Sequence, residues 1–474
     1  MNKRKISRRE LVAGVGVGAF ATTALASIPA KSRAEETGGE AVCAEDSLLA
    51  AGVAKSYTFL HTMMDAYAQG QTLRLIQSYS DQMQLLSTSF VYDNAVVINA
   101  LLERGDPENL QRALLLGKAL LYAQQNDSIG DGRVRQAYFV NQPDTNGVFV
   151  LPALAPFYFI GSATGDMAWV GMALTHLFAR SGEQQFLNGA VRLGQWIVKN
   201  TFSTTGAGGF TAGVDSNNNP LTYKSTEHNV DAFALFTMLA QLTGDSSWAT
   251  QAQYARSFVQ AMFNATSDFF WTGTLTDGAT INTSAIPEDV NTWSFLALRD
   301  EQFAGTVDWA KTNLAVTDTP QTFNNSVTGN KVRITGITYT NFAQHPPIVN
   351  NDFAPSDPFS TPPNPSSVWL EGTAHVVAAL SARNLPAELD LPGFIGDRNT
   401  ASSLLLNILG AQATQGAAQT CAGQPIPPGT GVLAASSELN TGFGFSYKPF
   451  LHIGATGWFA IAAQTGNPFQ IRGA

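Results

Sequence analysis

The chain has 474 residues, of which 44% are hydrophobic, 10% aromatic and only 13% charged. Charged residues are about half as frequent as in an average soluble protein, which predicts a surface built largely from neutral polar groups. The formal net charge is -9 and no basic cluster follows residue 35, which argues against nucleic acids and anionic membranes as partners. The length alone suggests about three domains, although closed repetitive folds form single domains of this size.

The first 34 residues have the features of a targeting segment followed by a linker. Arg8 and Arg9 precede a weakly apolar stretch, residues 13–26, which ends in the small-residue cleavage pattern Ala24-Leu25-Ala26. Cleavage near Ala34 is the alternative. Paired arginines in this position resemble a twin-arginine signal, with which the Tat translocase exports folded proteins. The sequence therefore predicts a periplasmic or secreted protein whose mature chain has no membrane span.

Only two cysteines occur, Cys43 and Cys421. In an oxidising compartment they could form one disulfide, and the alternative is two unpaired thiols. Neither their number nor their spacing suits a zinc site. The sequence also lacks a phosphate-binding loop on a βα unit, a nucleophile elbow and a metalloprotease motif. We therefore expect neither a metal nor a cofactor.

From about Leu48 onward the chain alternates between two kinds of helix. The first kind is amphipathic, with apolar residues three and four positions apart and charged or amide residues between them. Such helices bury one face and expose the other. The sequence predicts them at residues 49–68, 107–125, 183–199, 247–263, 300–314 and 399–411.

The second kind of helix is nearly uncharged after its first turn and rich in Ala, Leu, Val and Phe. A helix that is apolar on all sides must be buried. Several of these helices end in a turn with Gly or Asn, a common stop signal. The sequence predicts them at residues 93–102, 167–179, 227–242, 289–298, 369–382 and 452–464.

Six exposed helices that alternate with six buried ones predict an all-α fold, the (α/α)6 toroid. In this fold six helical hairpins close into one ring, here a single domain over residues 45–470. The alternative is an open α-solenoid, which the lack of polar caps at the ends disfavours. Short strands are expected between hairpins, at residues 134–140, 208–214, 269–281 and 331–340, the third around an Asp277-Gly278 turn.

The segment 225–231 opens one of the buried helices. Ser225 or Thr226 is the expected N-cap, which places Glu227 in the first turn, where the helix dipole favours an anion. Asp231 follows four residues later on the same face. One interpretation is an acid/base or substrate-binding pair. The other is ordinary helix capping by Glu227 and a structural hydrogen bond to Asp231.

All buried helices are expected to begin at one end of the ring, so their first turns should meet there. Acidic residues are ordinary at helix starts, but the Trp, Tyr and His residues beside them are not explained by capping. The candidates for a common site are Tyr92, Asp93, Trp169, Glu227, His228, Asp231, Asp289, Trp293, Trp369, Glu371 and His452, with Asp131 from a loop.

A cavity lined by carboxylates and aromatic rings suits a carbohydrate. Sugar faces pack on aromatic rings, while sugar hydroxyls bond to carboxylates, amides and imidazoles. Hydrolysis of a glycosidic bond needs one carboxyl group to protonate the leaving oxygen and a second to activate water or attack carbon. The predicted ring supplies enough acids for both.

On these residues, the chain from about 48 to 470 resembles the six-hairpin glycosidase superfamily, the (α/α)6 barrels, and particularly its exported bacterial members. The resemblance marks the fold more than any substrate. It implies a site at the N-terminal end of the inner helices and, for many members, an inverting reaction with a Glu acid and an Asp or Glu base. The matching stretches are residues 90–95, 130–133, 226–231, 369–374 and 442–445.

Glu227 is the candidate general acid, because burial at the head of an apolar helix raises the pKa of a carboxyl group. Glu371 or Asp93 is the candidate base. Asp131 could instead pair with Arg133. The remaining candidates would bind or stack on sugar, and for the tryptophans a place in the core is an equal alternative. These remaining candidates are Tyr92, Trp169, His228, Asp231, Asp289, Trp293, Trp369 and His452.

The leading prediction is a monomeric exported glycoside hydrolase that acts on an oligo- or polysaccharide. A polysaccharide lyase or sugar epimerase is the first alternative, and it needs basic residues for a uronic carboxylate, for which Arg133, Lys224 and Lys448 are the candidates. A non-catalytic glycan-binding protein of the cell envelope is the second.

Overall fold

The computed structural model describes residues 33–153, 159–320, 332–345, 363–383, 392–443 and 445–471. The chain separates into two units, Met1–Ser47 and Leu48–Ala474. The described part of the first unit is the beginning of helix α1 (Arg33–Met64). The predicted twin-arginine segment, including Arg8 and Arg9, lies outside the described residues.

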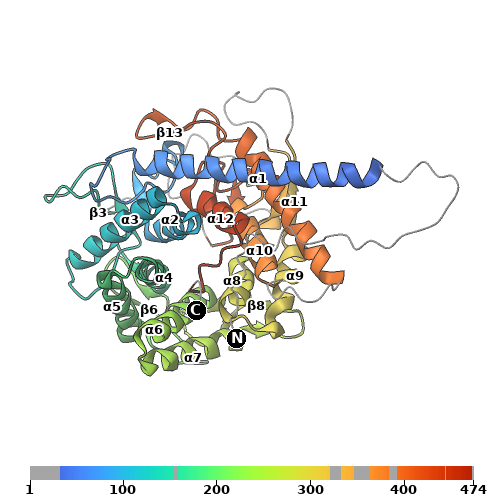
Figure 1. Ribbon diagram of the computed structural model, residues 1–474. Helices are drawn as coiled ribbons and strands as arrows, with labels where there is room; N and C mark the ends of the chain where they lie inside the picture. Colours follow the sequence, from blue (N-terminus) through green and yellow to red (C-terminus); the bar gives the residue numbers. More distant parts are fainter. Residues whose placement is uncertain are drawn as a thin grey trace, which may run out of the picture. The chain divides into compact units, whose positions relative to one another are not determined.

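Within the described residues of the second unit, six inner helices form a closed ring (Figure 1). Each contacts the next inner helix along the chain, and the last contacts the first. The predicted toroid is therefore confirmed, and the open solenoid is wrong. The inner helices are α2 (Val91–Arg104), α4 (Thr164–Ser181), α6 (Thr226–Thr243), α8 (Asp289–Leu298), α10 (Leu370–Arg383) and α12 (Ile453–Ala463).

The outer helices pack against the inner ones, and α1 closes the arrangement. Tyr57 on α1 donates a hydrogen bond to the carbonyl of Ala100 on α2 at 2.7 Å, and it accepts one from Gln464, just after α12, at 2.8 Å. Helix α1 thus joins the first and last inner helices. The other outer helices are α3 (Pro107–Gln125), α5 (Gln184–Thr201), α7 (Ser246–Ala261), α9 (Ala304–Asn313) and α11 (Pro392–Thr414).

Local chemistry sets the ends of the helices. The Ser225 hydroxyl accepts the amide of His228 at 3.3 Å and caps α6, which ends at Gly244 with φ of 70°. Helix α8 has the predicted bounds. Helices α1 and α11 begin earlier than predicted, at Arg33 and Pro392, because their first turns carry no amphipathic period by which a sequence pattern could detect them.

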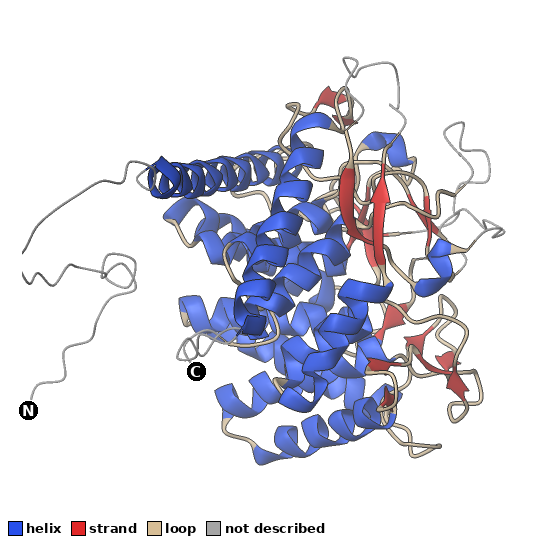
Figure 2. Ribbon diagram, turned by 90° about the vertical axis from the view of Figure 1, so that its right-hand side faces the viewer, coloured by secondary structure: helices blue, strands red, loops and turns tan. Residues whose placement is uncertain are grey.

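The strands are short and gather on one side of the helices (Figure 2). They form two three-stranded sheets and five pairs among the described residues. The sheets are β1 (Thr88–Phe90), β2 (Ala137–Phe139) and β3 (Leu151–Pro152), and β4 (Ser162–Ala163), β5 (Gly213–Val214) and β6 (Pro220–Leu221). The pairs are β7 (Phe263–Asn264) with β8 (Phe269–Phe270), β9 (Gly273–Thr274) with β10 (Ile281–Asn282), β11 (Ala315–Asp318) with β12 (Ile334–Ile337), β13 (Thr420–Cys421) with β14 (Gln424–Pro425), and β15 (Leu439–Asn440) with β16 (Ser446–Tyr447).

The predicted Asp277-Gly278 turn lies between β9 and β10, with the Leu275 amide donating to the Thr280 carbonyl at 2.8 Å. Strand β8, predicted to belong to the same hairpin, pairs with β7 instead. Strand β1 runs directly into α2, and β4 into α4. The strands and loops therefore surround the N-terminal end of the inner helices.

The segment 467–470 covers the opposite end of the inner ring. The ring of Phe469 lies 5.2 Å from that of Trp169 and 5.5 Å from that of Trp293. Asn467 and Gln470 donate hydrogen bonds at 3.0 Å to carbonyls at the C-terminal end of α8. These contacts hold the end of the chain against the core tryptophans.

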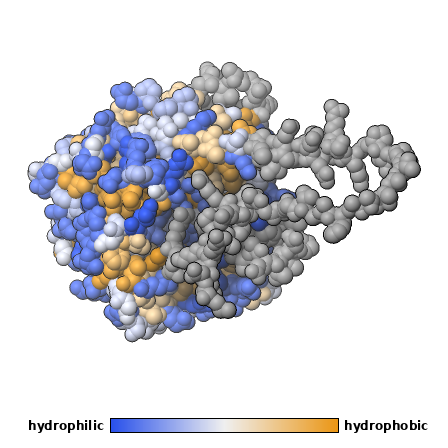
Figure 3. All heavy atoms as spheres, in the orientation of Figure 1, coloured by the Kyte–Doolittle hydropathy of each residue, from blue (hydrophilic) through white to orange (hydrophobic). Residues whose placement is uncertain are grey.

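The face seen in Figure 3 mixes small hydrophobic patches with hydrophilic residues. Among the described residues, no helix combines the length and the apolarity needed to cross a bilayer. Cys421 is buried and unpaired within that part of the chain, whereas the side chain of Cys43 lies outside it. The disulfide between the two cysteines therefore stays a prediction.

Candidate active site

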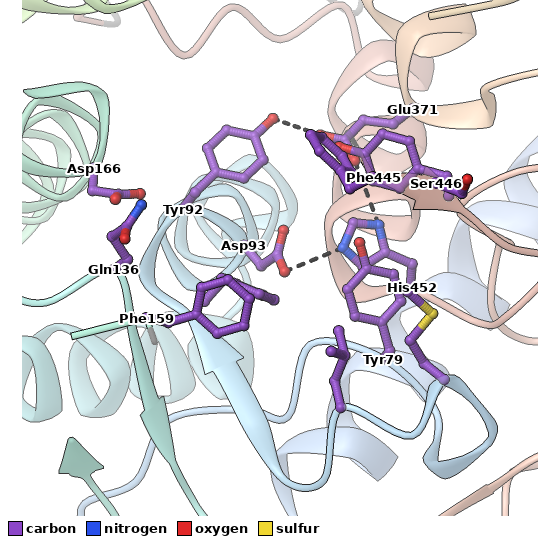
Figure 4. A pocket seen from close by; sticks show the side chains of 14 residues that line it. Tyr79, Tyr92, Asp93, Gln136, Phe159, Asp166, Glu371, Phe445, Ser446 and His452 are labelled. Atoms are coloured by element: carbon purple, nitrogen blue, oxygen red, sulfur yellow. Dashed lines mark hydrogen bonds and ion pairs between the residues drawn. The ribbon is translucent and has the colours of Figure 1, made fainter. Parts of the chain in front are cut away.

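A cavity of about 260 Å³ opens at the N-terminal end of the inner helices (Figure 4). Helices α2, α4 and α10 supply Tyr92, Asp93, Asp166 and Glu371 from their first turns, and His452 caps α12. Loops and strands supply the rest of the lining. The other lining residues are Tyr79, Met83, Leu85, Phe90, Gln136, Phe159, Phe445, Ser446 and Tyr447.

His452 lies between two carboxyl groups. Its Nε2 is 3.1 Å from Asp93 Oδ2, and its Nδ1 is 3.4 Å from Glu371 Oε2. The Ala455 amide donates to Nδ1 at 3.2 Å, so the neutral ring carries its proton on Nε2, facing Asp93. Burial lowers the pKa of His452, but Asp93 and Glu371 more than offset this and leave the pKa raised. The imidazole therefore gains a proton readily between the two acids.

Glu371 is held by a chain of hydrogen bonds. The Tyr92 hydroxyl donates to Glu371 Oε1 at 2.5 Å, and the Trp458 indole donates to the Tyr92 oxygen at 2.9 Å. Burial raises the pKa of Glu371 to about 7, with His452 and Tyr92 lowering it and Asp93 raising it further. A carboxyl group with this pKa exchanges its proton near neutral pH.

Asp93 and Glu371 are neighbours across Gly454, the second residue of α12. A Cβ atom at Gly454 would lie 2.7 Å from Asp93 Oδ1 and 3.1 Å from Glu371 Oε2. Only a residue without a side chain leaves both carboxyl groups in place. We call Asp93, Glu371 and His452 the cavity group.

Three further acids form a second cluster, the inner group: Glu227, Asp231 and Asp289. Burial, followed by the charges of neighbouring acids, raises the pKa of Glu227 and Asp231 well above the ordinary range. Burial raises the pKa of Asp289 to about 7, although the Val290 amide and the Tyr339 hydroxyl lower it. The charge of Glu371 also raises the pKa of Glu227. None of the three inner acids belongs to the lining of the described cavity.

Asp166 lines the cavity at the start of α4. Burial raises its pKa to about 8, the Ala163 amide lowers it, and the charge of Asp93 raises it. In Figure 4 Asp166 and Glu371 lie on opposite sides of Tyr92. At neutral pH Asp166 therefore carries a proton that it can donate to a ligand.

A buried pair, Glu288 and His375, lies beneath Glu371. His375 Nδ1 is 2.9 Å from Glu288 Oε2, and Thr292 donates to the other Glu288 oxygen at 2.7 Å. His375 Nε2 is 3.8 Å from Glu371 Oε1. Burial raises the pKa of Glu288 and lowers that of His375, so burial favours the neutral form of both side chains.

Besides His228 and the three acids of the inner group, four candidates from the sequence lie outside the cavity lining. Trp169 and Trp293 pack with Trp458 in the core, their ring centroids 5.9 and 6.1 Å from it. Trp369 is buried against Tyr447, with nearly parallel rings 5.8 Å apart. Asp131 bonds to Arg133 at 2.7 Å and to the indole of Trp196 at 3.0 Å. Of the alternatives, the three tryptophans therefore have the core position, and Asp131 has the local ion pair with Arg133.

His228, at the start of α6, is likewise not among the lining residues. Burial lowers its pKa to about 4, and its Nδ1 has no hydrogen-bond partner among the described residues. A Cβ on Gly165 would lie 2.6 Å from the ring and 3.2 Å from Asp231. His228 and Asp231 thus meet α4 where only glycine fits.

Among the described residues, no cluster of three or more His, Cys, Asp or Glu side chains is arranged to hold a metal ion. In the cavity group, the imidazole of His452 contacts both carboxyl groups.

No family model matches the sequence, and no curated protein matches it. Solved structures do match. D-mannose isomerase has a TM-score of 0.55 and 10% identity, covering 88% of this chain and 96% of its own. A family 76 glycoside hydrolase from a bovine Bacteroides thetaiotaomicron strain has a TM-score of 0.53 and 12% identity, covering 87% of this chain and 77% of its own. An inactive variant of an α-1,6-mannanase from Salegentibacter sp. HEL1_6, in complex with α-1,6-mannotriose, has a TM-score of 0.50 and 12% identity. The match covers 90% of this chain and 100% of the mannanase.

The fold is an (α/α)6 barrel, as in these solved structures. The resemblance seen in the sequence is therefore confirmed for the fold. At these identities the comparisons establish the arrangement of the barrel's helices, and the site must be argued from this chain's own residues.

Sequence reasoning missed several residues that shape the site of this barrel. His375 follows Glu371 by four residues, a spacing that places both on one helix face and could have revealed it. Trp458 stands out as the one aromatic ring with a polar atom in α12, whose other residues are small, aliphatic or phenylalanine. Tyr79, Gln136 and Phe159 come from loops, where no periodicity marks them.

Proposed function

We propose that this protein is a glycoside hydrolase that acts on a neutral glycan in the cavity at the N-terminal end of the barrel. The observation that carries the proposal is the meeting of Asp93 and Glu371 at His452 within that cavity. Aromatic side chains, among them Tyr79, Tyr447 and Phe445, supply surfaces for a sugar face. The names of the structural neighbours, which include mannanases and glycosidases, agree with a sugar ligand.

Glu371 acts as the general acid in this proposal. With a pKa of about 7 it holds a proton near neutral pH and releases it easily to the glycosidic oxygen as the carbon–oxygen bond breaks. Glu227, the acid expected from the sequence, has a pKa well above the ordinary range and does not line the cavity, so it is a weaker donor. Because the inner group lies outside the cavity lining, this proposal gives it no contact with the sugar.

Asp93 supplies the second carboxyl group. As a carboxylate beside His452 it either takes a proton from the water that adds to the sugar carbon or attacks that carbon itself. The first route inverts the anomeric centre and the second retains it. Proton NMR of the first product formed distinguishes the two routes.

The test is a set of single substitutions assayed on neutral and uronic glycans. We expect Glu371→Gln and Asp93→Asn each to lower the release of reducing sugar from a neutral glycan by about a thousandfold, because each removes a proton donor or acceptor. If both variants keep their turnover, the proposal is contradicted. Binding without turnover across the panel indicates the glycan-binding envelope protein.

A sugar isomerase or epimerase is the second candidate, and His452 is the observation that favours it. An imidazole at the cavity wall with a raised pKa can move a proton on or off a sugar carbon. The likeness to D-mannose isomerase agrees with this chemistry. Conversion of free mannose to another hexose, lost in His452→Gln, would identify this activity.

A uronate lyase is disfavoured by the charges around the cavity. The described lining of the cavity contains no Lys or Arg to hold a uronic carboxylate. The Lys224 ammonium bonds the carbonyls of Thr205 and Gly278, and Arg133 bonds Asp131. These two candidate cations thus have other partners.

We also propose that the protein is exported as a folded monomer by the Tat translocase and works in the periplasm or outside the cell. The paired Arg8 and Arg9 before a mild apolar stretch support this. Replacement of both with lysine should leave the protein in the cytoplasm, as fractionation and immunoblotting would show. Equal export of the wild-type and variant chains would contradict the proposal.

A further inference from the structure

One side of the cavity consists of apolar side chains that the proposed hydrolysis does not use. Met83, Leu85, Phe90 and Phe159 line it beside the acids. Met83 and Leu85 belong to a small hydrophobic cluster that is separate from the main core, and Phe90 and Phe159 pack on this cluster. Phe90 and Phe159 meet edge to face at 4.8 Å. We call these four residues the apolar wall.

The apolar wall lies apart from the acidic side. In Figure 4 Phe159 lies on one side of Asp93, while Tyr92 and Glu371 lie on the other. The acidic side contains Asp93, Glu371 and the phenol of Tyr92. The cavity therefore offers hydrogen-bonding groups on the acidic side and carbon atoms along the apolar wall, while Gln136 and Asp166 line a third part of it.

The loop 81–88 is built to present this wall. Gln84 and Leu86 have φ of 59° and 54°, a left-handed conformation that residues with side chains rarely adopt. The Asp81 carboxylate fixes the loop by accepting the Gly423 amide at 2.9 Å and the Thr420 hydroxyl at 2.8 Å. As a result Leu85 is 5% exposed and lines the cavity, whereas Leu86 is 60% exposed and faces solvent.

A sugar ring does not suit the apolar wall. Its hydroxyls would lose hydrogen bonds to water against Met83 and Leu85, which offer none in return. An alkyl or aryl group loses nothing there and gains burial. We propose that the substrate is a glycoside with an apolar leaving group: the sugar lies at the cavity group and the alkyl or aryl portion lies against the apolar wall. This inference rests on the proposed hydrolysis.

The experiment compares hexyl with methyl glycosides of mannose and glucose, in both anomers. These pairs share the sugar and differ only in the apolar chain. Binding is measured by titration calorimetry, and hydrolysis by release of hexanol or methanol. We expect at least one sugar to be bound and hydrolysed about tenfold better as its hexyl than as its methyl glycoside.

Three near-isosteric variants locate the effect. Leu85→Asn and Met83→Gln place an amide in the wall and should each reduce the hexyl-to-methyl ratio at least about threefold. Leu86→Asn is the matched control, because it changes the exposed neighbour in the same loop and Asn tolerates the left-handed conformation. Its ratio should equal that of the wild type. If Leu85→Asn fails to fold, Met83→Gln decides.

The outcomes separate this inference from the proposed function. Equal handling of hexyl and methyl glycosides, or a preference that survives both wall variants, overturns the apolar leaving group even if hydrolysis is observed. A hexyl preference in binding without release of either alcohol supports the apolar wall and overturns hydrolysis. Binding of none of these glycosides overturns both.

Discussion

The cavity group and the inner group start from the same kind of residue at the same kind of position. Asp93, Glu371, Glu227 and Asp289 all lie in the first turn of an inner helix. In the cavity group, the imidazole of His452 contacts both carboxyl groups. In the inner group, the charges that act on Glu227 are those of other acids.

This difference separates two chemical roles. Where an imidazole and a phenol offset burial, the pKa of Glu371 stays at about 7, and the proton is exchangeable. At Glu227 and Asp231, where the charges of neighbouring acids add to burial, the pKa is raised well above the ordinary range. The first arrangement suits acid/base catalysis in the cavity, whereas the second, outside the cavity lining, suits a supporting role.

The largest expected effect tests this separation directly. Glu371→Gln should lower kcat/KM by about a thousandfold, because it removes the proton donor, whereas Glu227→Gln should lower it about tenfold. The rates are measured on whichever glycoside the wild type hydrolyses. Glu108→Gln, in the first turn of α3 with a side chain 65% exposed, is the control and should be neutral. If both variants lost kcat/KM equally, the assignment of Glu371 rather than Glu227 as the general acid would be contradicted.

Gly454→Ala should lower kcat by about a hundredfold without unfolding the protein. The new methyl group would press on Asp93 and Glu371 and displace at least one of them. Gly410→Ala, in α11, has nothing within 4 Å of the added carbon and serves as the control. It should stabilise the protein by up to about 1 kcal/mol through helix propensity, as denaturant unfolding would show. Unchanged kcat in Gly454→Ala would mean that the spacing of the cavity group does not matter.

Tyr92→Phe should lower kcat about tenfold and shift its pH dependence. The Tyr92 hydroxyl stabilises the Glu371 carboxylate, so its removal raises the pKa of Glu371 above about 7. The loss of activity with rising pH should then occur at higher pH, seen in the pH profile of kcat. Tyr122→Phe removes a hydroxyl that bonds Asp144 away from the cavity, and its profile should match the wild type. A shift to lower pH would contradict Glu371 as the acid.

The smallest effect concerns stability between pH 6.5 and 8.5. The pKa values of Glu371 and Asp289 are raised from 4.5 and 3.8 to about 7, and that of Asp166 from 3.8 to about 8. Their contribution to stability is complete below their unfolded pKa values and is lost as pH rises through 7 to 8. The lowered pKa of His228, about 4, acts below this window.

The unfolding temperature should therefore fall by a few degrees from pH 6.5 to 8.5, measured by calorimetry. Asp289→Asn should flatten this decline, because an amide does not ionise. A rise in unfolding temperature over the same interval would contradict this prediction, because it would show that other groups outweigh the ionisation of the buried acids.

The alternation of exposed and buried helices was enough to predict the closed ring, and helix α8 has the predicted bounds. This succeeded because burial on all sides imposes an apolar composition that any position in the ring must satisfy. The Ser225 cap and the Asp277-Gly278 turn were equally predictable, since both depend on neighbours within a few residues.

Tertiary structure alone decided which first-turn acids line the cavity. That choice depends on how each helix is rotated about its axis, and long-range packing fixes the rotation, as where Gly454 of α12 lets Asp93 and Glu371 approach. The apolar wall was invisible in the sequence for a related reason. The loop that carries Met83 and Leu85 follows no period, and its conformation is set by Asp81 reaching residues more than 300 positions away.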